Sequence, residues 1–416
     1  MSATKPFIIS KQLVYEAFKA VKANAGSAGV DGQSIADFEQ SLKDNLYKIW
    51  NRMSSGTYFP PPVKAVSIPK KSGGERILGV PTVADRVAQM VVRIVFESKV
   101  EPIFLPDSYG YRPGKSALDA IGVTRQRCWY RDWVLEFDIR KLFDEIDHNL
   151  LLKAVWKHTE CKWSRLYIER WLKAPMQLAD GTLVKRTKGT PQGGVVSPVL
   201  SNLFLHYTFD LWMGRTFPGV PWCRYADDGL IHCETQQQAE AIKAALMARL
   251  AECGLELHPE KTKIVYCKDG SRKGKFPNKK FDFLGYTFRP RAVKNRNRNS
   301  MFVSFSPAAS STALTAMRHE TRRRNFRNRS DLNLEDISRL YNPILRGWLE
   351  YYGRFCPSGM YPVLRHFNNT LVAWARRKYK RLQRHKTRAS RFIEGIAKKQ
   401  PRLFVHWQRG MIGSFA

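Results

Sequence analysis

Residues 224–231 place two adjacent carboxylates, Asp227 and Asp228, between short apolar runs. The runs at 220–223 and 230–233 are typical of a tight β-hairpin with both aspartates at its tip. Because side chains alternate along a strand, only a turn lets both carboxylates reach the same small volume. Like charges this close raise each other's pKa unless a cation compensates, and Mg²⁺ prefers carboxylates together with substrate phosphates. The pattern indicates a Mg²⁺ and phosphate site, although Asp-Asp-Gly is also ordinary turn chemistry.

A third carboxylate, Asp138, ends a mostly apolar run that begins at residue 133. A buried strand that delivers a carboxylate to its end is suited to an active site, although Asp138 could equally cap the following segment. Further on, residues 189–194 place three glycines around Pro191 and Gln192. Such glycines permit close approach of the backbone to a ligand, and the amides at the start of the predicted helix favour phosphate.

The composition indicates a polyanionic partner. The 416 residues include 70 Lys and Arg against 36 Asp and Glu, a net charge of +34. An aromatic content of 12% argues against a disordered basic tail, so nucleic acid is the first partner to consider and an acidic membrane surface the second. No apolar run approaches the ~18 residues of a membrane span, and nucleic acid rather than a membrane is the expected partner. Seven cysteines without a C-x-x-C pair argue against a disulfide framework and a zinc module, and a reducing cytoplasm is expected.

The elements that must position these residues follow from the patterns along the chain. Apolar residues at helical spacing predict helices before residue 62, and hairpins are predicted over 63–80 and 176–188. Further helices are predicted from about residue 117, around 150–173 and over 236–253. After residue 288 the chain becomes strongly basic, with eleven Lys and Arg and one acid in 289–329, and nine Lys and Arg and no acid in 376–391. An amphipathic helical stripe between these runs, with Pro343 inside it, predicts a helical domain with a basic exterior.

The order of the motifs resembles a known family. Asp138 at a strand end, Pro-Gln-Gly at 191–193, Tyr-Ala-Asp-Asp at 225–228 and Phe-Leu-Gly-Tyr at 283–286 together look like a reverse transcriptase. The chain is most similar to the reverse transcriptase-maturases of bacterial group II introns. Segments 29–32, 68–70, 76–81 and 109–113 resemble that family's fingers motifs, and 340–348 resembles its thumb or maturase domain.

The resemblance implies an α+β fold, a right-hand polymerase with an antiparallel-sheet palm and fingers followed by a helical thumb/maturase domain. It assigns residues 1–62 to an N-terminal extension and the start of the fingers. Residues 63–295 would form the fingers and palm, and residues 296–416 the RNA-binding thumb/maturase domain. Since no Cys or His cluster follows the helical region, a DNA endonuclease domain is not expected.

The resemblance also implies an active site for phosphoryl transfer with two Mg²⁺ ions. The implied metal ligands are three carboxylates and one backbone carbonyl, from Asp138, Asp227, Asp228 and Ile139, and the three aspartates are the implied catalytic residues. Contacts to the deoxynucleoside triphosphate (dNTP) would come from Lys70, Arg76, Ile139, Phe143, Gln192, Lys261 and Lys263. Among these, Phe143 would exclude a ribose 2′-hydroxyl, and either Lys261 or Lys263 could donate a proton to pyrophosphate. Nucleic acid would be bound by the basic side chains Arg112, Lys115, Arg322, Arg323, Arg324, Arg376, Arg377, Lys378, Lys380 and Arg381.

The implied function is an RNA-directed DNA polymerase that copies its intron RNA and also binds that RNA to assist splicing and mobility. The expected partners are group II intron RNA, an RNA template with a DNA primer, target DNA and dNTPs, in the bacterial cytoplasm at the nucleoid. Two alternatives stay open at this point. One is an RNA-binding splicing factor without polymerase activity, and the other is a reverse transcriptase of a defence or retron system.

Overall fold

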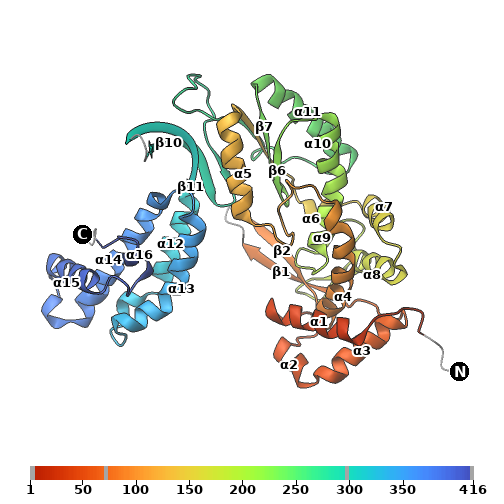
Figure 1. Ribbon diagram of the computed structural model, residues 1–416. Helices are drawn as coiled ribbons and strands as arrows, with labels where there is room; N and C mark the ends of the chain where they lie inside the picture. The colour runs from red at the N-terminus through yellow and green to blue at the C-terminus, as the bar shows by residue number, and fades with distance from the viewer. Residues whose placement is uncertain (1–4, 70–73, 296–298, 413–416) are drawn as a thin grey trace. The chain divides into compact units, whose positions relative to one another are not determined.

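The computed structural model describes residues 5–69, 74–295 and 299–412 (Figure 1). The chain forms two compact units, Met1–Ala120 with Leu135–Lys263, and Ile121–Val134 with Ile264–Ala416. It passes between the units within α5 (Ala117–Tyr130), β3 (Trp133–Asp138) and β8 (Lys263–Tyr266). Within the described ranges, no helix combines the length and the apolar character that a membrane crossing requires.

The first unit begins with helices, as the apolar spacing predicts. They are α1 (Lys11–Ala23), α2 (Ile35–Gln40) and α3 (Leu42–Ser54). Ser10 and Ser34 cap α1 and α2, each accepting a hydrogen bond from a backbone N–H three residues later. Phe18 and Phe38 stack with ring centroids 5.6 Å apart and join these helices. The long helix α4 (Val83–Val100), which Thr82 caps, is buried along much of its length.

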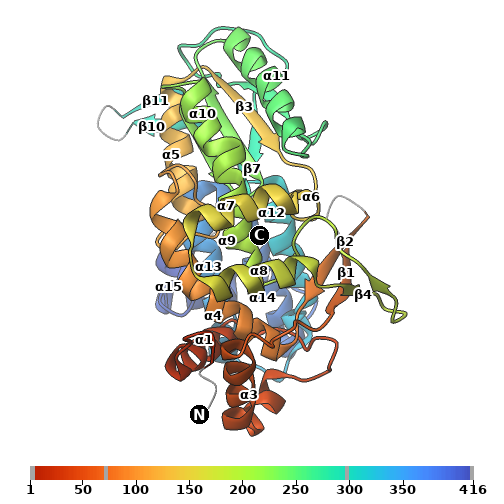
Figure 2. The ribbon, with the colours of Figure 1, turned by 90° about the vertical axis from the view of Figure 1, so that its right-hand side faces the viewer.

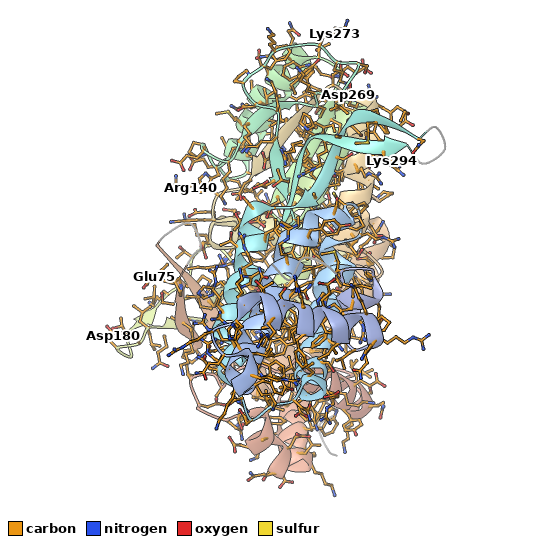
Figure 3. All side chains as sticks on the ribbon, turned by 90° about the vertical axis from the view of Figure 1, so that its left-hand side faces the viewer. Glu75, Arg140, Asp180, Asp269, Lys273 and Lys294 are labelled. Carbon is orange, nitrogen blue, oxygen red and sulfur yellow. The ribbon has the colours of Figure 1, made fainter. Side chains whose placement is uncertain are left out.

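Two hairpins form one four-stranded sheet in the order β2-β1-β4-β5. The strands are β1 (Val63–Pro69), β2 (Glu75–Val80), β4 (Met176–Gln177) and β5 (Leu183–Val184). Strands β1 and β2 are antiparallel with Lys64 opposite Val80, whereas β1 and β4 are parallel. Figure 3 labels Glu75 and Asp180, which mark the outer ends of the two hairpins. Both predicted hairpins are confirmed, and Lys70 lies outside the described residues.

The carboxylates lie on a second four-stranded sheet, in the order β6-β7-β3-β8. Strands β6 (Trp222–Tyr225) and β7 (Asp228–Cys233) form an antiparallel hairpin. Helices α10 (Leu211–Thr216) and α11 (Gln236–Glu252) lie alongside β7 in both views (Figure 1, Figure 2). The remaining helices of this unit are η1 (Glu101–Ile103), α6 (Leu142–Glu145), α7 (His148–His158), α8 (Lys162–Lys173), α9 (Ser197–Leu205) and the π-helical turn η2 (His206–Asp210). Most residues of β3 and β7 are buried, which explains their apolar sequences.

The second unit contains a sheet of β9 (Phe281–Phe283), β10 (Tyr286–Asn295) and β11 (Ser300–Ala309), in the order β11-β10-β9. The prediction of a helical domain from residue 296 is therefore wrong for 300–309. Val303 and Phe305 alternate there with serines, and this period of two suits a strand. The predicted boundary at 295/296 separates two paired strands, whereas the compact units divide after Lys263. The functional domain limits stay a prediction.

Helices follow the sheet over the rest of the second unit. They are α12 (Ser311–Arg323), η3 (Phe326–Asn328), α13 (Leu334–Tyr352), η4 (Pro357–Met360), α14 (Tyr361–Lys378), η5 (Lys380–Leu382), α15 (Lys386–Lys399) and α16 (Val405–Gln408). Their core is apolar and aromatic, with Tyr341, Phe367 and Trp374 among its large side chains. Helix α13 contains Pro343, as predicted.

Candidate active site

The two adjacent aspartates lie at the turn between β6 and β7, as predicted. Tyr225 pairs with Asp228 across the hairpin, which leaves Ala226 and Asp227 as the turn residues. Ala226 has a left-handed backbone with φ of 56°, which a tight hairpin of this kind requires. The turn brings Asp227 and Asp228 to one end of the sheet.

Asp138 reaches the same end of the sheet from β3, the neighbour of β7. The backbone N–H of Ile139 donates to the carbonyl oxygen of Asp227 at 3.2 Å, so Asp138 lies directly beside the turn. The ammonium of Lys261 donates to Oδ2 of Asp138 at 2.7 Å, across 123 positions of sequence. Lys263 instead pairs with Glu136 at 3.1 Å. Of the two lysines that the sequence left open, Lys261 is therefore the one that contacts a site carboxylate.

The electrostatics of this cluster reflect buried negative charge. Burial, followed by the charges of Asp227 and Asp138, raises the pKa of Asp228 to about 7. Burial and the charge of Asp138 also raise the pKa of Asp227. Burial opposes protonation of Lys261, but its contact with Asp138 prevails and raises the pKa of this lysine. The cluster thus favours bound positive charge, which Lys261 supplies in part.

The donor set of the carboxylate cluster fits a hard cation. Carboxylate and carbonyl oxygens are the ligands that Mg²⁺ prefers, and a cation would relieve the repulsion that raises these pKa values. In the portion of the chain that the structure describes, however, no three His, Cys, Asp or Glu side chains already form a metal site.

A buried ion pair beneath the turn supports the site, and sequence reasoning missed it. Arg224 is fully buried, and its guanidinium donates to both carboxylate oxygens of Asp210, at 2.8 and 2.7 Å. It also donates to Oγ of Ser108 at 2.8 Å and to the carbonyl of Ala226 at 3.2 Å. The last bond connects the ion pair to the turn itself. The available signal was an arginine inside an otherwise apolar strand, which must find a partner when buried.

Arg76 and Gln192 come together from segments 116 positions apart. Nε of Arg76 donates to Oε1 of Gln192 at 2.5 Å, and the N–H of Gly79 donates to the carbonyl of Gln192 at 2.7 Å. A Cβ on Gly193, where φ is 118°, would lie 2.6 Å from the carbonyl oxygen of Gly79, so the close approach requires glycine. The Pro-Gln-Gly segment is thus fixed against β2, with Arg76 at the same place.

Two other predicted nucleotide contacts, Phe143 and Ile139, are buried. Phe143, in α6, is 8% exposed, and Ile139 is almost fully buried. The carbonyl of Phe143 accepts from the N–H of Thr190 at 2.6 Å, which joins α6 to the start of the Pro-Gln-Gly segment. These contacts place Phe143 beside that segment. Its role at the sugar stays a prediction.

Two of the predicted nucleic-acid contacts are engaged with their own chain. The side chain of Arg112 is 7% exposed, and its guanidinium pairs with Glu101 at 2.7 Å and donates to the carbonyls of Leu105 and Ser108 at 2.6 and 2.7 Å. Lys115 donates to the carbonyl of Pro106 at 3.0 Å. Their contact with nucleic acid stays a prediction, and the present geometry gives both side chains a structural role.

The predicted basic residues of the second unit are mostly at its surface. The exposed ones are Arg322, Arg323, Arg324, Arg377, Lys380 and Arg381, whereas Arg376 and Lys378 are half-buried. Glu320 pairs with Arg323 and Arg324, and Lys378 donates to the carbonyls of Ser330 and Leu332. Charge type alone did not distinguish the cations that face solvent from those that hold the fold.

Comparison with known proteins agrees with this geometry. Residues 68–288 match the family described as reverse transcriptase (RNA-dependent DNA polymerase). The chain belongs to the reverse transcriptase family. Residues 314–392 of this reverse transcriptase match the group II intron maturase-specific domain. The resemblance to group II intron reverse transcriptase-maturases and the α+β polymerase fold are thereby confirmed.

Individual relatives cover different shares of the reverse transcriptase. It is 32% identical to protein YkfC of Escherichia coli over 66% of this chain and 78% of that protein. It is 34% identical to the group II intron-encoded protein LtrA of Lactococcus lactis over 48% of this chain, and it spans only about a third, 33%, of LtrA. A solved structure of telomerase from Candida albicans with a fragment of telomeric RNA aligns with 91% of this chain and 69% of that chain, with 12% identity and a TM-score of 0.47.

Proposed function

We propose that this reverse transcriptase copies group II intron RNA into DNA and binds the intron RNA to assist its splicing and mobility. The observation that carries the polymerase assignment is the meeting of Asp138 with the Asp227-Asp228 turn. The match to a maturase-specific domain and the exposed cations of the second unit support the RNA-binding role. The substrates are dNTPs and an RNA template with a DNA primer, and target DNA is a further partner.

The side chains of Asp138, Asp227 and Asp228, with the carbonyl of Ile139, are the donors that would hold two Mg²⁺ ions. When bound, such ions activate the primer 3′-hydroxyl and stabilise charge on the leaving pyrophosphate. The protein itself supplies position and charge. Lys261, already at the carboxylates, is suited to donate a proton to pyrophosphate.

The dNTP would be held from the side of β2 and the Pro-Gln-Gly segment. The guanidinium of Arg76 is planar and permanently charged, which suits phosphate oxygens, and Gln192 orients it through their hydrogen bond. Phe143 would lie under the sugar and exclude a 2′-hydroxyl, and Lys70 would assist Arg76.

The maturase role would use binding alone. Exposed arginines and lysines neutralise phosphate charge and can hold an RNA tertiary structure without any chemical step by the protein. We place this activity in the bacterial cytoplasm, in association with the nucleoid where target DNA lies.

Primer extension on an RNA template with dNTPs and Mg²⁺ tests the polymerase assignment. The wild type should synthesise DNA, whereas Asp227→Asn should lose activity by about 10³-fold or more, because it removes a ligand of an ion that would stabilise the transition state by several kcal/mol. Binding of structured RNA should be unchanged in this variant, since the substitution leaves the second unit intact. Full activity of Asp227→Asn would refute the metal assignment. Tight RNA binding without synthesis by either protein would instead favour the splicing-factor alternative.

A further inference from the structure

Tyr111 has a backbone conformation that its residue type disfavours. Its φ is 59°, in the left-handed region where non-glycine residues are uncommon and bulky ones are strained. Its side chain is nevertheless 47% exposed. Residues held in strained conformations cluster at functional sites, and this one is next to a residue in direct contact with the carboxylate turn.

The preceding residue, Gly110, is fixed against the turn. A Cβ on Gly110 would lie 2.4 Å from the backbone nitrogen of Ala226, so the two backbones touch. Nδ2 of Asn202 donates to the carbonyl of Gly110 at 2.7 Å, and the N–H of Tyr109 donates to the carbonyl of Arg224 at 2.8 Å. The chain therefore reaches Tyr111 immediately after crossing the Tyr225-Ala226 segment.

The following residue, Arg112, is fixed as well. Its contacts with Glu101, Leu105 and Ser108 anchor the chain on the far side of Tyr111. With both neighbours held, the backbone of Tyr111 is fixed next to the carboxylate turn.

The phenol of Tyr111 is also within electrostatic reach of the site. Burial raises its pKa, the charge of Asp227 raises it further, and the charge of Arg76 opposes the rise. The phenol therefore keeps its proton at neutral pH. Tyr111 therefore interacts electrostatically with the aspartates of the turn and with Arg76, the cation that would bind the triphosphate.

A purely structural explanation for a tyrosine here is weak. The left-handed backbone would be met without strain by glycine, and at lower cost by asparagine. A tyrosine needed for packing would be buried, as Tyr109 is at 5% exposed. What tyrosine adds to this position is a half-exposed ring within electrostatic reach of Asp227.

We propose that the Tyr111 ring packs against the incoming deoxynucleotide, next to the reacting carboxylates. This inference rests on the proposed polymerase function and adds a substrate-binding residue to it. Stacking of an aromatic ring on a nucleobase tolerates every base, because each has a π-face. A contact of this kind suits a polymerase that must accept all four dNTPs.

Single-turnover extension over a range of dNTP concentrations, with primer–template affinity measured separately, tests the assignment. Tyr111→Gly suits the left-handed backbone and removes only the ring, so it should fold and should weaken dNTP binding about tenfold for each of the four dNTPs. Tyr111→Phe keeps the ring and should bind dNTPs like the wild type. Tyr130→Ala, at a tyrosine that is 81% exposed on α5, is the matched control and should change neither affinity.

The outcomes separate this inference from the proposed function. Wild-type dNTP affinity in Tyr111→Gly would overturn the inference while leaving the polymerase assignment intact. A loss of primer–template affinity with unchanged dNTP affinity would also overturn it, because the ring would then contact the primer–template. A wild type that makes no DNA at all would instead refute the proposed function. Tyr111→Asn, whose side chain tolerates the same backbone, should reproduce the glycine result.

Discussion

The two units of this reverse transcriptase use charge in opposite ways. At the carboxylate site of the first unit, charges are fixed by partners: Arg224 and Asp210 form a fully buried pair, and the partly exposed Lys261 contacts Asp138. In the second unit the core is apolar and aromatic, and the predicted RNA-binding arginines lie mostly at the surface.

This difference corresponds to two kinds of task. Phosphoryl transfer depends on charges fixed relative to the reacting atoms, and burial among partners fixes them. Binding a long polyanion depends on how many cations meet phosphate, and each of them contributes little by itself. Removing one charge should therefore be severe in the first unit and mild in the second.

The largest effect on stability is expected at the buried pair. Arg224→Met alone, or Asp210→Asn alone, should lower the free energy of unfolding by about 3–5 kcal/mol, because each leaves a buried polar or charged partner uncompensated. The double variant Arg224→Met with Asp210→Leu should recover most of this loss, since neither charge then remains buried. Urea unfolding measures both quantities, with Arg322→Met on the exposed surface of α12 as the control.

If both single variants lowered the free energy of unfolding by less than about 1 kcal/mol, the contrast between the two units would be contradicted. Such a small loss would mean that water reaches the pair and that the turn does not depend on it. Stability that stays low in the double variant would show instead that the hydrogen bond from Arg224 to Ala226, rather than charge pairing, holds the turn.

A smaller effect, dependent on pH, is expected from the core of the second unit. His406 lies on α16 among aromatic rings, donates to Oδ1 of Asn368 at 2.7 Å, and has its pKa lowered by burial from 6.5 to about 3. Below pH 6.5 the histidine is protonated in the unfolded chain, whereas in the folded chain it stays neutral down to about pH 3. The free energy of unfolding therefore falls as pH falls through this range.

Unfolding of the wild type and His406→Gln at about pH 7.5 and about pH 5 measures this contribution. Glutamine keeps a donor for Asn368 but does not titrate, so the wild type should lose on the order of 2 kcal/mol more than the variant on acidification. An equal loss in both proteins would show that the buried histidine takes up its proton without unfolding the core.

What the sequence could predict was local. The hairpin of Asp227 and Asp228, the strand ending at Asp138 and the hairpin at Arg76 each depend on a few neighbouring residues whose alternation and turn chemistry determine the element. The pairing of Arg224 with Asp210 could not be found in this way, because it needs the strand and a π-helical turn to be folded against each other.

The sequence also could not predict whether a charged side chain faces solvent or binds its own chain. Arg112 and Lys378 have the same residue types as solvent-facing cations, yet both donate to backbone carbonyls of their own chain. The choice of Lys261 over Lys263 depended on where a loop of the chain passes Asp138, which composition does not encode. Strand β11 was missed because its basic surroundings concealed an alternating apolar pattern.

The smallest effects on RNA binding are expected from replacing single surface cations of the second unit. Replacing several of them together tests the contrast between the two units best. Arg322, Arg377 and Arg381 are exposed, so glutamine at each should weaken binding of structured RNA only slightly. If all three meet phosphate, the triple variant should reduce the slope of log affinity against log salt concentration by about 2–3, since each contact releases about 0.7–0.9 counterions. Lys378→Gln is the matched control: its ammonium holds the carbonyls of Ser330 and Leu332, so it should lower unfolding stability and leave the slope unchanged. An unchanged slope in the triple variant would show that other cations form the RNA-binding surface. A full loss of binding from one substitution would show that the second unit also relies on a few fixed charges.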